Sequence, residues 1–112
     1  MTHAVQALRV YRFHPSKLDP VTVFVEQYSK NASRVTVQCY SRAWTAYWGN
    51  HGSDKVEDFI CGSGHEYVAN NLTWGLNGLF LKSVTKREFA YLCRIVIAMQ
   101  EHFRSFLVGG QQ

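Results

Sequence analysis

The stretch RVTVQCYS, residues 34–41, decides the fold. Apolar side chains occupy every second position, and polar or aromatic ones alternate with them. The first set is Val35, Val37 and Cys39, and the second is Arg34, Thr36, Gln38 and Tyr40. A period of two is typical of a β-strand with one buried and one solvated face. The stretch therefore predicts a sheet that is covered on one side.

Three further segments extend this sheet. ALRVYRF (7–13) and VTVFVEQY (21–28) precede it and are rich in β-branched and aromatic residues. Between them, the loop HPSKLDP carries two prolines that a central strand excludes, and SKNAS makes the next turn. AWTAYWG (43–49) continues as a fourth strand after a bend at Ser41-Arg42. Because connections this short favour antiparallel neighbours, we predict a three- or four-stranded antiparallel meander.

The second half of the chain changes to helical signals. Two residue pairs have the spacing of a capping box, in which side chains satisfy free backbone amides at a helix start. The pairs and their predicted helices are Asp54 with Glu57 for residues 54–61, and Ser63 with Glu66 for residues 64–73. The segment TWGLNGLF (73–80) contains two glycines and an asparagine and is predicted to be a loop.

A third pair, Thr85 with Glu88, opens a long helix at about residues 86–107, which ends before the Gly109-Gly110 pair. At about 100° per residue its apolar side chains form one broad stripe. The stripe comprises Phe89, Leu92, Val96, Met99, Phe103, Phe106 and Leu107. We expect it to pack on one face of the sheet. The fold class is therefore α+β, with residues 1–112 forming a single domain.

Composition narrows the class of protein. The 112 residues are 46% hydrophobic and 18% charged, as in a globular domain. Cys39, Cys61 and Cys93 are far apart and form no C-x-x-C pair, so we predict buried free thiols and neither a zinc site nor a disulfide framework. No run approaches the roughly 20 apolar residues of a membrane span, and no secretory signal follows Met1. We expect a cytoplasmic protein without a metal or cofactor.

The aromatic residues of the fourth strand are the first candidates for a contact site. Trp44 and Trp48 share one face of the strand, and Tyr47 lies on the other. Two interpretations stay open: the tryptophan face fills the core under the long helix, or it forms a platform for a partner. Arg42 flanks the strand, and His51 lies in the turn GNHGSD that follows. The predicted contact surface is Trp44, Tyr47, Trp48, His51 and Arg42.

Nucleic acid is the alternative partner. The net charge is +4, although the basic side chains are scattered rather than gathered in one stripe. In this interpretation the sheet aromatics stack on bases. The phosphates would be neutralised by Arg34, Arg42, Lys82, Lys86 and Arg87. Affinity that falls steeply with salt would be the signature of such binding.

No sequence motif indicates a particular enzymatic reaction. His51 beside Asp54 could serve as a general base, yet no nucleophile with a recognisable turn accompanies the pair. CGSGHEY (61–67) has the glycines of a phosphate-binding turn. It lacks the lysine of a P-loop, and it follows a predicted helix rather than a strand. We therefore predict no catalytic residue and no enzymatic activity.

Longer runs of the sequence carry a family resemblance. They are LDPVTVFVEQY, the segment from Arg34 to Leu72 with its distinctive AWTAYWG, and the later YLCRIVIAM. Over roughly Leu18 to Met99 the chain resembles small proteins encoded by tailed bacteriophages and prophages of Gram-negative bacteria. The resemblance implies a setting, the cytoplasm of an infected or lysogenic bacterium, and supplies no catalytic residues.

Small accessory phage proteins of this kind commonly act by binding host enzymes, defence complexes or nucleic acid. The resemblance thus implies binding to a host or phage protein, as a modulator or inhibitor of host machinery or defence, with nucleic acid as the alternative. Tyr91, Ile95 and His102 widen the apolar stripe of the long helix on one flank. We expect the short helices to cover this flank; a homodimer through it is the competing explanation.

Overall fold

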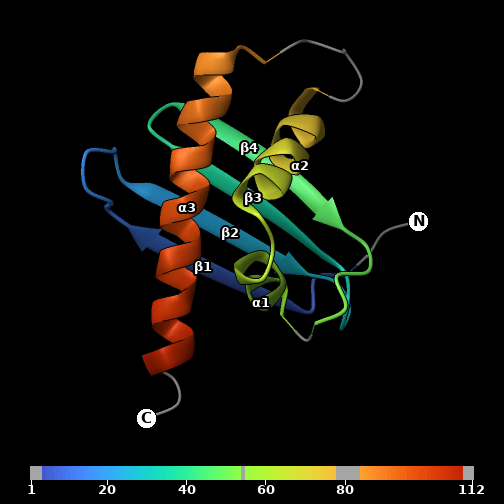
Figure 1. Cartoon of the computed structure of the whole chain (residues 1–112). Helices are drawn as coiled ribbons and strands as arrows, with labels where there is room; N and C mark the ends of the chain where they lie inside the picture. Colours follow the sequence, from blue (N-terminus) through green and yellow to red (C-terminus); the bar gives the residue numbers. More distant parts are fainter. Residues whose placement is uncertain (1–3, 54, 78–83, 110–112) are drawn as a thin grey trace.

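The computed structural model describes residues 4–53, 55–77 and 84–109. Its four strands form one antiparallel sheet in the order β1-β2-β3-β4, so each strand pairs with its neighbours along the chain (Figure 1). The strands are β1 Ala7–Phe13, β2 Val21–Gln27, β3 Ser33–Cys39 and β4 Arg42–Trp48. The meander predicted from the sequence is confirmed, with four strands.

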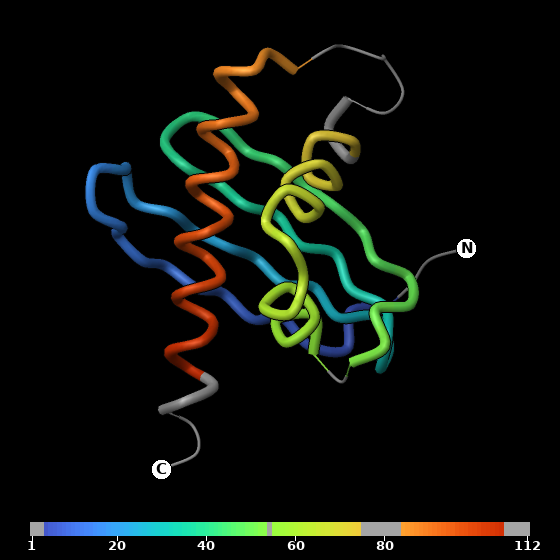
Figure 2. Tube along the Cα trace, viewed as in Figure 1, coloured from blue at the N-terminus to red at the C-terminus, as the bar shows by residue number. Residues whose placement is uncertain are grey.

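Three helices follow the sheet, and all lie on the same side of it (Figure 1). They are α1 Val56–Cys61, α2 His65–Asn77 and α3 Lys86–Gly109. Helix α2 packs along β4, and α3 contacts both shorter helices. The Cα trace in Figure 2 shows that the chain completes the sheet before it turns back over one face. The α+β class is confirmed.

A two-residue loop, Tyr40-Ser41, joins β3 to β4. Cys39 and Arg42 pair directly across this loop. Tyr40 has φ of 59°, a left-handed conformation that glycine or asparagine adopts more readily than tyrosine. The loop lies one residue before the bend predicted at Ser41-Arg42, and it fixes the register of β4 against β3.

The helices seal one face of the sheet. The face of β3 predicted to be buried, with Val35, Val37 and Cys39, has no exposed surface. Alternate residues of the neighbouring strands join it: Val21, Val23, Val25, Trp44, Ala46 and Trp48. The helices complete the core with Val56, Ile60, Val68, Ala69, Leu72, Leu92, Ile95, Val96, Met99 and Phe103. The opposite face of the sheet is covered by no described element, and we call it the open face.

The apolar stripe predicted on α3 is buried from Leu92 to Phe103. Phe106, at its C-terminal end, is exposed, and Leu107 lies outside the residues whose side chains are described. Ile95 on the flank of the stripe is buried, so the extra apolar width serves packing within the chain. The rings of Tyr91 and His102 on this flank contact Trp44 and Phe13 of the sheet, and not the short helices that we expected to cover them. Within the described residues, no helix combines the length and the apolar content that crossing a bilayer requires.

Side chains of α3 also hold the end of α1. The Gln100 amide nitrogen donates hydrogen bonds to the carbonyl oxygens of Ile60, at 3.0 Å, and Ser63, at 2.8 Å. Arg104 donates to the carbonyl of Cys61 at 3.3 Å. Carbonyl groups at a helix C-terminus have no partner within the helix, so these bonds stabilise the end of this short element.

One of the three predicted capping boxes is confirmed at its first residue. The backbone N–H of Glu88 donates to the Thr85 hydroxyl at 3.0 Å, so Thr85 caps α3. The second box is wrong, because the Ser63 hydroxyl instead donates to the carbonyl of Phe59 at 2.8 Å, and α2 begins only at His65.

The first predicted box begins at Asp54, which lies outside the described residues. Helix α1 begins after Lys55, whose side chain makes no capping bond. Glu57 turns toward β1 and makes an ion pair there instead.

Helix α2 is longer than the sequence suggests. It continues to Asn77, through most of the segment predicted to be a loop from residue 73. Val68 and Leu72 are fully buried on the side facing the core. A glycine inside a helix costs about 1 kcal/mol, and tertiary packing of an amphipathic face readily outweighs that cost. Trp74 therefore belongs to a helix and not to a loop.

Candidate interaction site between helices α2 and α3

The two tryptophans of β4 belong to the core. Trp44 is 3% exposed and Trp48 is 7% exposed, because helices cover the face on which they lie. The Trp48 indole N–H donates to the Tyr67 hydroxyl at 3.3 Å, and the Trp44 ring lies 6.3 Å from the ring of Tyr91. The core-filling interpretation is right for both, and neither can contact a partner of the folded chain.

His51 is also buried, at 4% exposure. Its backbone N–H donates to the carbonyl of Asn31 at 3.0 Å, and its Nε2 lies 3.3 Å from the Ser33 hydroxyl. Burial is the largest influence on the ring and lowers the pKa of His51. A Ser–His pair can activate a nucleophile, but Ser33 has no exposed surface, so a substrate cannot reach it. His51 is thus a core residue rather than a contact residue.

Tyr47 faces away from the helices and is half exposed on the open face. Arg34 lies directly opposite it on β3, and the guanidinium carbon is 5.8 Å from the centre of the Tyr47 ring. That distance fits a cation–π contact. Tyr47 and Arg34 therefore form a small exposed pair on the open face.

The basic side chains predicted to bind nucleic acid do not converge. Arg42 and Arg87 line one cleft on the helix side of the sheet. Arg34 lies five residues away along the paired strands, about 17 Å at about 3.3 Å per residue, and on the opposite face. Lys86 is exposed in the first turn of α3, and Lys82 lies outside the described residues. The set is divided between two faces.

A partly buried ion pair, which the sequence did not indicate, joins β1 to α1. The Arg9 Nε and Nη2 donate to the two carboxylate oxygens of Glu57 at 2.6 and 2.8 Å. The Tyr11 hydroxyl donates to the same carboxylate, and Arg9 Nη1 donates to the Gln27 side-chain oxygen at 2.8 Å. Since both carboxylate oxygens are engaged within the chain, the cluster fastens α1 to the sheet rather than holding a ligand.

The charges of this cluster are mutually stabilised. Burial alone would raise the pKa of the Glu57 carboxyl, but hydrogen bonds from Arg9 and Tyr11 outweigh burial and bring the pKa below its ordinary value. Burial, together with the hydrogen bond to Glu57, raises the pKa of Tyr11. At neutral pH the carboxylate is therefore ionised and the phenol is protonated.

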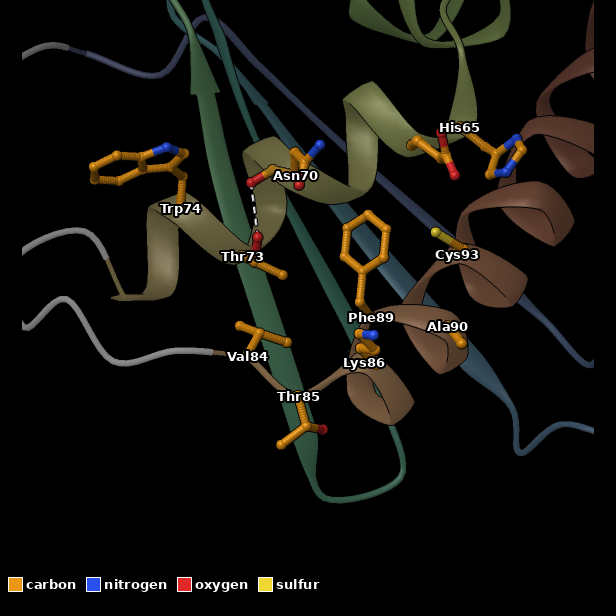
Figure 3. A pocket seen from close by; sticks show the side chains of 11 residues that line it. His65, Asn70, Thr73, Trp74, Val84, Thr85, Lys86, Phe89, Ala90 and Cys93 are labelled. Atoms are coloured by element: carbon orange, nitrogen blue, oxygen red, sulfur yellow. Dashed lines mark hydrogen bonds between the residues drawn. The ribbon is translucent and has the colours of Figure 1, made fainter.

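An open groove lies between α2 and the start of α3 (Figure 3). Its volume is about 740 Å³. Its lining comprises His65, Glu66, Asn70, Thr73 and Trp74 from α2, and Val84, Thr85, Lys86, Phe89, Ala90 and Cys93 from α3 and the residues just before it. Figure 3 shows the Phe89 ring standing between the two helices, with His65 and Cys93 together at one end of the groove.

Trp74 lies at the other end of the groove and is 65% exposed (Figure 3). The hydroxyl of its neighbour Thr73 donates a hydrogen bond to the Asn70 carbonyl oxygen at 2.8 Å. This polar group of the α2 wall is therefore already bonded within the helix. Trp74 is not among the contact residues predicted from the sequence, because Gly75 and Asn77 suggested a loop. The signal that could have found it is its spacing, since Trp74 lies four residues after Asn70 and seven after Tyr67, on one helix face.

The titratable side chains of the groove include one thiol, that of Cys93. Burial, with a smaller contribution from Glu66, raises the pKa of the Cys93 thiol, so the reactive thiolate is scarce at neutral pH. Among the described residues there is no group of three or more histidine, cysteine, aspartate or glutamate side chains placed to hold a metal ion. The expected absence of an enzyme activity stays a prediction.

A family model described as a phage family matches residues 2–77, more than half of the chain. The chain belongs to this phage family. Neither the search of curated proteins nor the search of solved structures gives a match. Within the phage-family match lie all four strands, α1 and α2, whereas α3 follows it. One wall of the groove therefore comes from the matched segment and the other from residues that follow it.

Proposed function

We propose that this phage-family protein acts by binding a protein partner, of the phage or of its host cell, through the groove between α2 and α3. The observation that carries the proposal is the exposure of Trp74 at the rim of that groove. Tryptophan is strongly enriched among the residues that dominate binding energy at interfaces. An indole left largely in water beside an apolar groove gains most when a partner covers it.

The shape of the groove favours a segment of protein over a small molecule. Its walls run along α2 from His65 to Trp74, nine residues or about 14 Å at 1.5 Å per residue. That length accommodates about two turns of a helix or a short extended segment. Small-molecule sites usually enclose most of the ligand surface, whereas this groove is open to solvent.

The chemistry of the lining indicates which segment would fit. Phe89, Ala90 and Cys93 make the α3 wall of the groove largely apolar. Glu66 lies on the first turn of α2, and Lys86 lies on the first turn of α3, so opposite charges mark different parts of the rim. A segment with one large apolar side chain between a basic and an acidic residue would complement this pattern.

Affinity capture from a lysate of infected cells tests the proposal, with wild-type protein, Trp74→Ala and Tyr47→Ala as matched baits. Both replaced side chains are exposed aromatics, one at the groove and one on the open face. We expect a captured protein that survives nuclease treatment, is retained by Tyr47→Ala and is lost from Trp74→Ala. Removal of a tryptophan that dominates the binding energy of an interface costs about 2 kcal/mol or more, which is roughly a thirty-fold loss of affinity.

Each other outcome has a definite meaning. Loss from Tyr47→Ala with retention by Trp74→Ala would move the contact site to the open face. Nuclease-sensitive capture would favour nucleic acid, the alternative partner. Equal thermal midpoints of the three baits are the control, because a destabilised variant would lose binding for an unrelated reason. Because Trp44 and Trp48 are buried, acrylamide quenching of fluorescence reports mainly on Trp74 and should fall when the partner is bound.

A further inference from the structure

Strand β1 forms one edge of the sheet. It pairs with β2 along all seven of its residues, and no described strand pairs with its other side. The backbone N–H and C=O groups on that side are consequently available to another strand. An edge of this kind is a template for β-pairing unless something blocks it.

Most of the devices that usually block an edge are missing from β1. The strand contains neither proline nor lysine, and its register with β2 runs from Ala7 opposite Gln27 to Phe13 opposite Val21 without a bulge. Its two charged residues are engaged within the chain, because Arg9 pairs with Glu57 and Arg12 donates to the Thr22 hydroxyl. Bulges, prolines and free charged side chains are among the means by which monomeric proteins prevent edge-to-edge pairing. Strand β1 is therefore competent for pairing along its whole length.

Exposed apolar side chains flank this edge on both faces of the sheet. Leu8 and Val10 are 60% and 54% exposed on the open face, and Val5, just before the strand, is 46% exposed. On the helix side, Phe106 is 56% exposed, and its ring lies 5.6 Å from that of Tyr11. Four of the large exposed apolar residues of the described chain thus surround a single strand, which marks an interface.

We infer that β1 pairs with β1 of a second copy of this chain, so that two sheets join into one antiparallel sheet of eight strands. A strand can pair in the antiparallel sense with the same strand of a second copy about a two-fold axis. This symmetry closes the assembly as a dimer. The other edge strand, β4, suits a second copy less well. The only large apolar side chain exposed among its described residues is Tyr47, which already contacts Arg34.

Charge selects the register of this pairing. With the axis at Val10, all seven residues of β1 find a partner, and Val10 meets Val10 of the other copy. Arg9 then lies opposite Tyr11 and Arg12 opposite Leu8, so no like charges face each other. With the axis at Arg9, two arginines would lie directly opposite, which destabilises a strand pair. With the axis at Tyr11, fewer residues pair.

The mass in solution tests the interface without any knowledge of the functional partner. We expect wild-type protein to have twice the mass of one chain by light scattering at micromolar to millimolar concentration. Val10→Lys should raise the dimer dissociation constant at least tenfold, because it places two charges at the centre of the contact. Ala43→Lys, exposed on the open face of β4, is the matched control and should leave the dimer intact. A monomeric wild type, or a dimer that resists Val10→Lys and dissociates with Ala43→Lys, would overturn the inference.

A cross-linking experiment tests the register. Directly opposite β-carbons in an antiparallel pair lie about 4.5–5.5 Å apart, close enough for a disulfide after small adjustment. Val10→Cys should therefore form a dimer on non-reducing gels after mild oxidation. Leu8→Cys should not, because Leu8 and its counterpart would lie four residues apart, about 14 Å. Cross-linking by Leu8→Cys alone would contradict the register centred on Val10. Neither experiment depends on the groove, so the dimer and the proposed function stand or fall separately.

Discussion

The covered and open faces of the sheet are made by alternate residues of the same strands. Val35 and Val37 of β3 have no exposed surface, whereas Arg34 between its buried neighbours lies on the other face. On β4 the contrast is sharper, because Trp48 is sealed and the adjacent Tyr47 is half exposed. Side chains one position apart thus serve stability in one case and contact with the surroundings in the other. Whether a side chain is aromatic does not decide which of these two roles it has.

The largest expected effect comes from breaking the covered face at Trp44. Trp44→Ala removes a 97% buried indole, given its 3% exposure, and leaves a cavity between β4 and α3, so we expect a loss of about 3–5 kcal/mol in the free energy of unfolding. Tyr47→Ala on the open face should cost less than about 1 kcal/mol, including its contact with Arg34. Urea denaturation followed by circular dichroism measures both.

Equal losses in the two variants would mean that the open face is covered in solution, for instance by a partner or by a second sheet. A small loss for Trp44→Ala would mean that the indole is not part of the core. Either result would remove the distinction between the two faces on which the site assignment depends.

The strands could be predicted from the sequence because their signal is local. Alternation in RVTVQCYS identifies which residues share a face, and the short connections identify the neighbours. The choice of buried face in AWTAYWG could not be made in the same way, because both faces carry aromatic residues. That choice depends on where α2 packs, which is a tertiary contact.

The helix starts were less predictable, because a side chain with the spacing of a capping residue can instead bond to a residue that is distant in the sequence. Glu57 has the spacing of a capping residue, yet it pairs with Arg9, 48 residues earlier in the chain. No local pattern reveals such a pair. The candidate groove was hidden for a related reason, since propensity alone suggested a loop at Trp74 and packing against β4 continued the helix.

The next largest effect concerns the rim of the covered face, where Glu57 fastens α1 to β1. Glu57→Gln keeps the shape of the side chain and removes its charge, so we expect a loss of about 2 kcal/mol at pH 7. The folded-state pKa of Glu57 lies below its ordinary value of 4.5. The ionised carboxylate therefore stabilises the fold fully above about pH 4.5 to 5, and this contribution disappears as the pH falls through the folded-state pKa.

Denaturation of wild type and Glu57→Gln between pH 7 and pH 3 measures this dependence, and the two curves should approach each other at the acid end. Glu88→Gln is the matched control. Its ion pair with Arg42 is exposed on both sides, at 39% and 50%, so its loss should change stability by less than about 1 kcal/mol. A difference between wild type and Glu57→Gln that persists unchanged in acid would show that the carboxylate charge is not its cause.

The smallest expected effect is at Tyr40, in the two-residue loop between β3 and β4. Tyr40 has φ of 59° and is 77% exposed, so its side chain gains few contacts for an unfavourable backbone conformation. Tyr40→Asn should raise the free energy of unfolding by up to about 1 kcal/mol, because asparagine adopts this conformation more readily. Ser41→Asn, at the next position and without a positive φ, should leave the thermal midpoint unchanged. A loss of stability in Tyr40→Asn would mean that the tyrosine ring packs on the loop or on Arg42 strongly enough to compensate its backbone, and that this end of the sheet is less open than its exposure indicates.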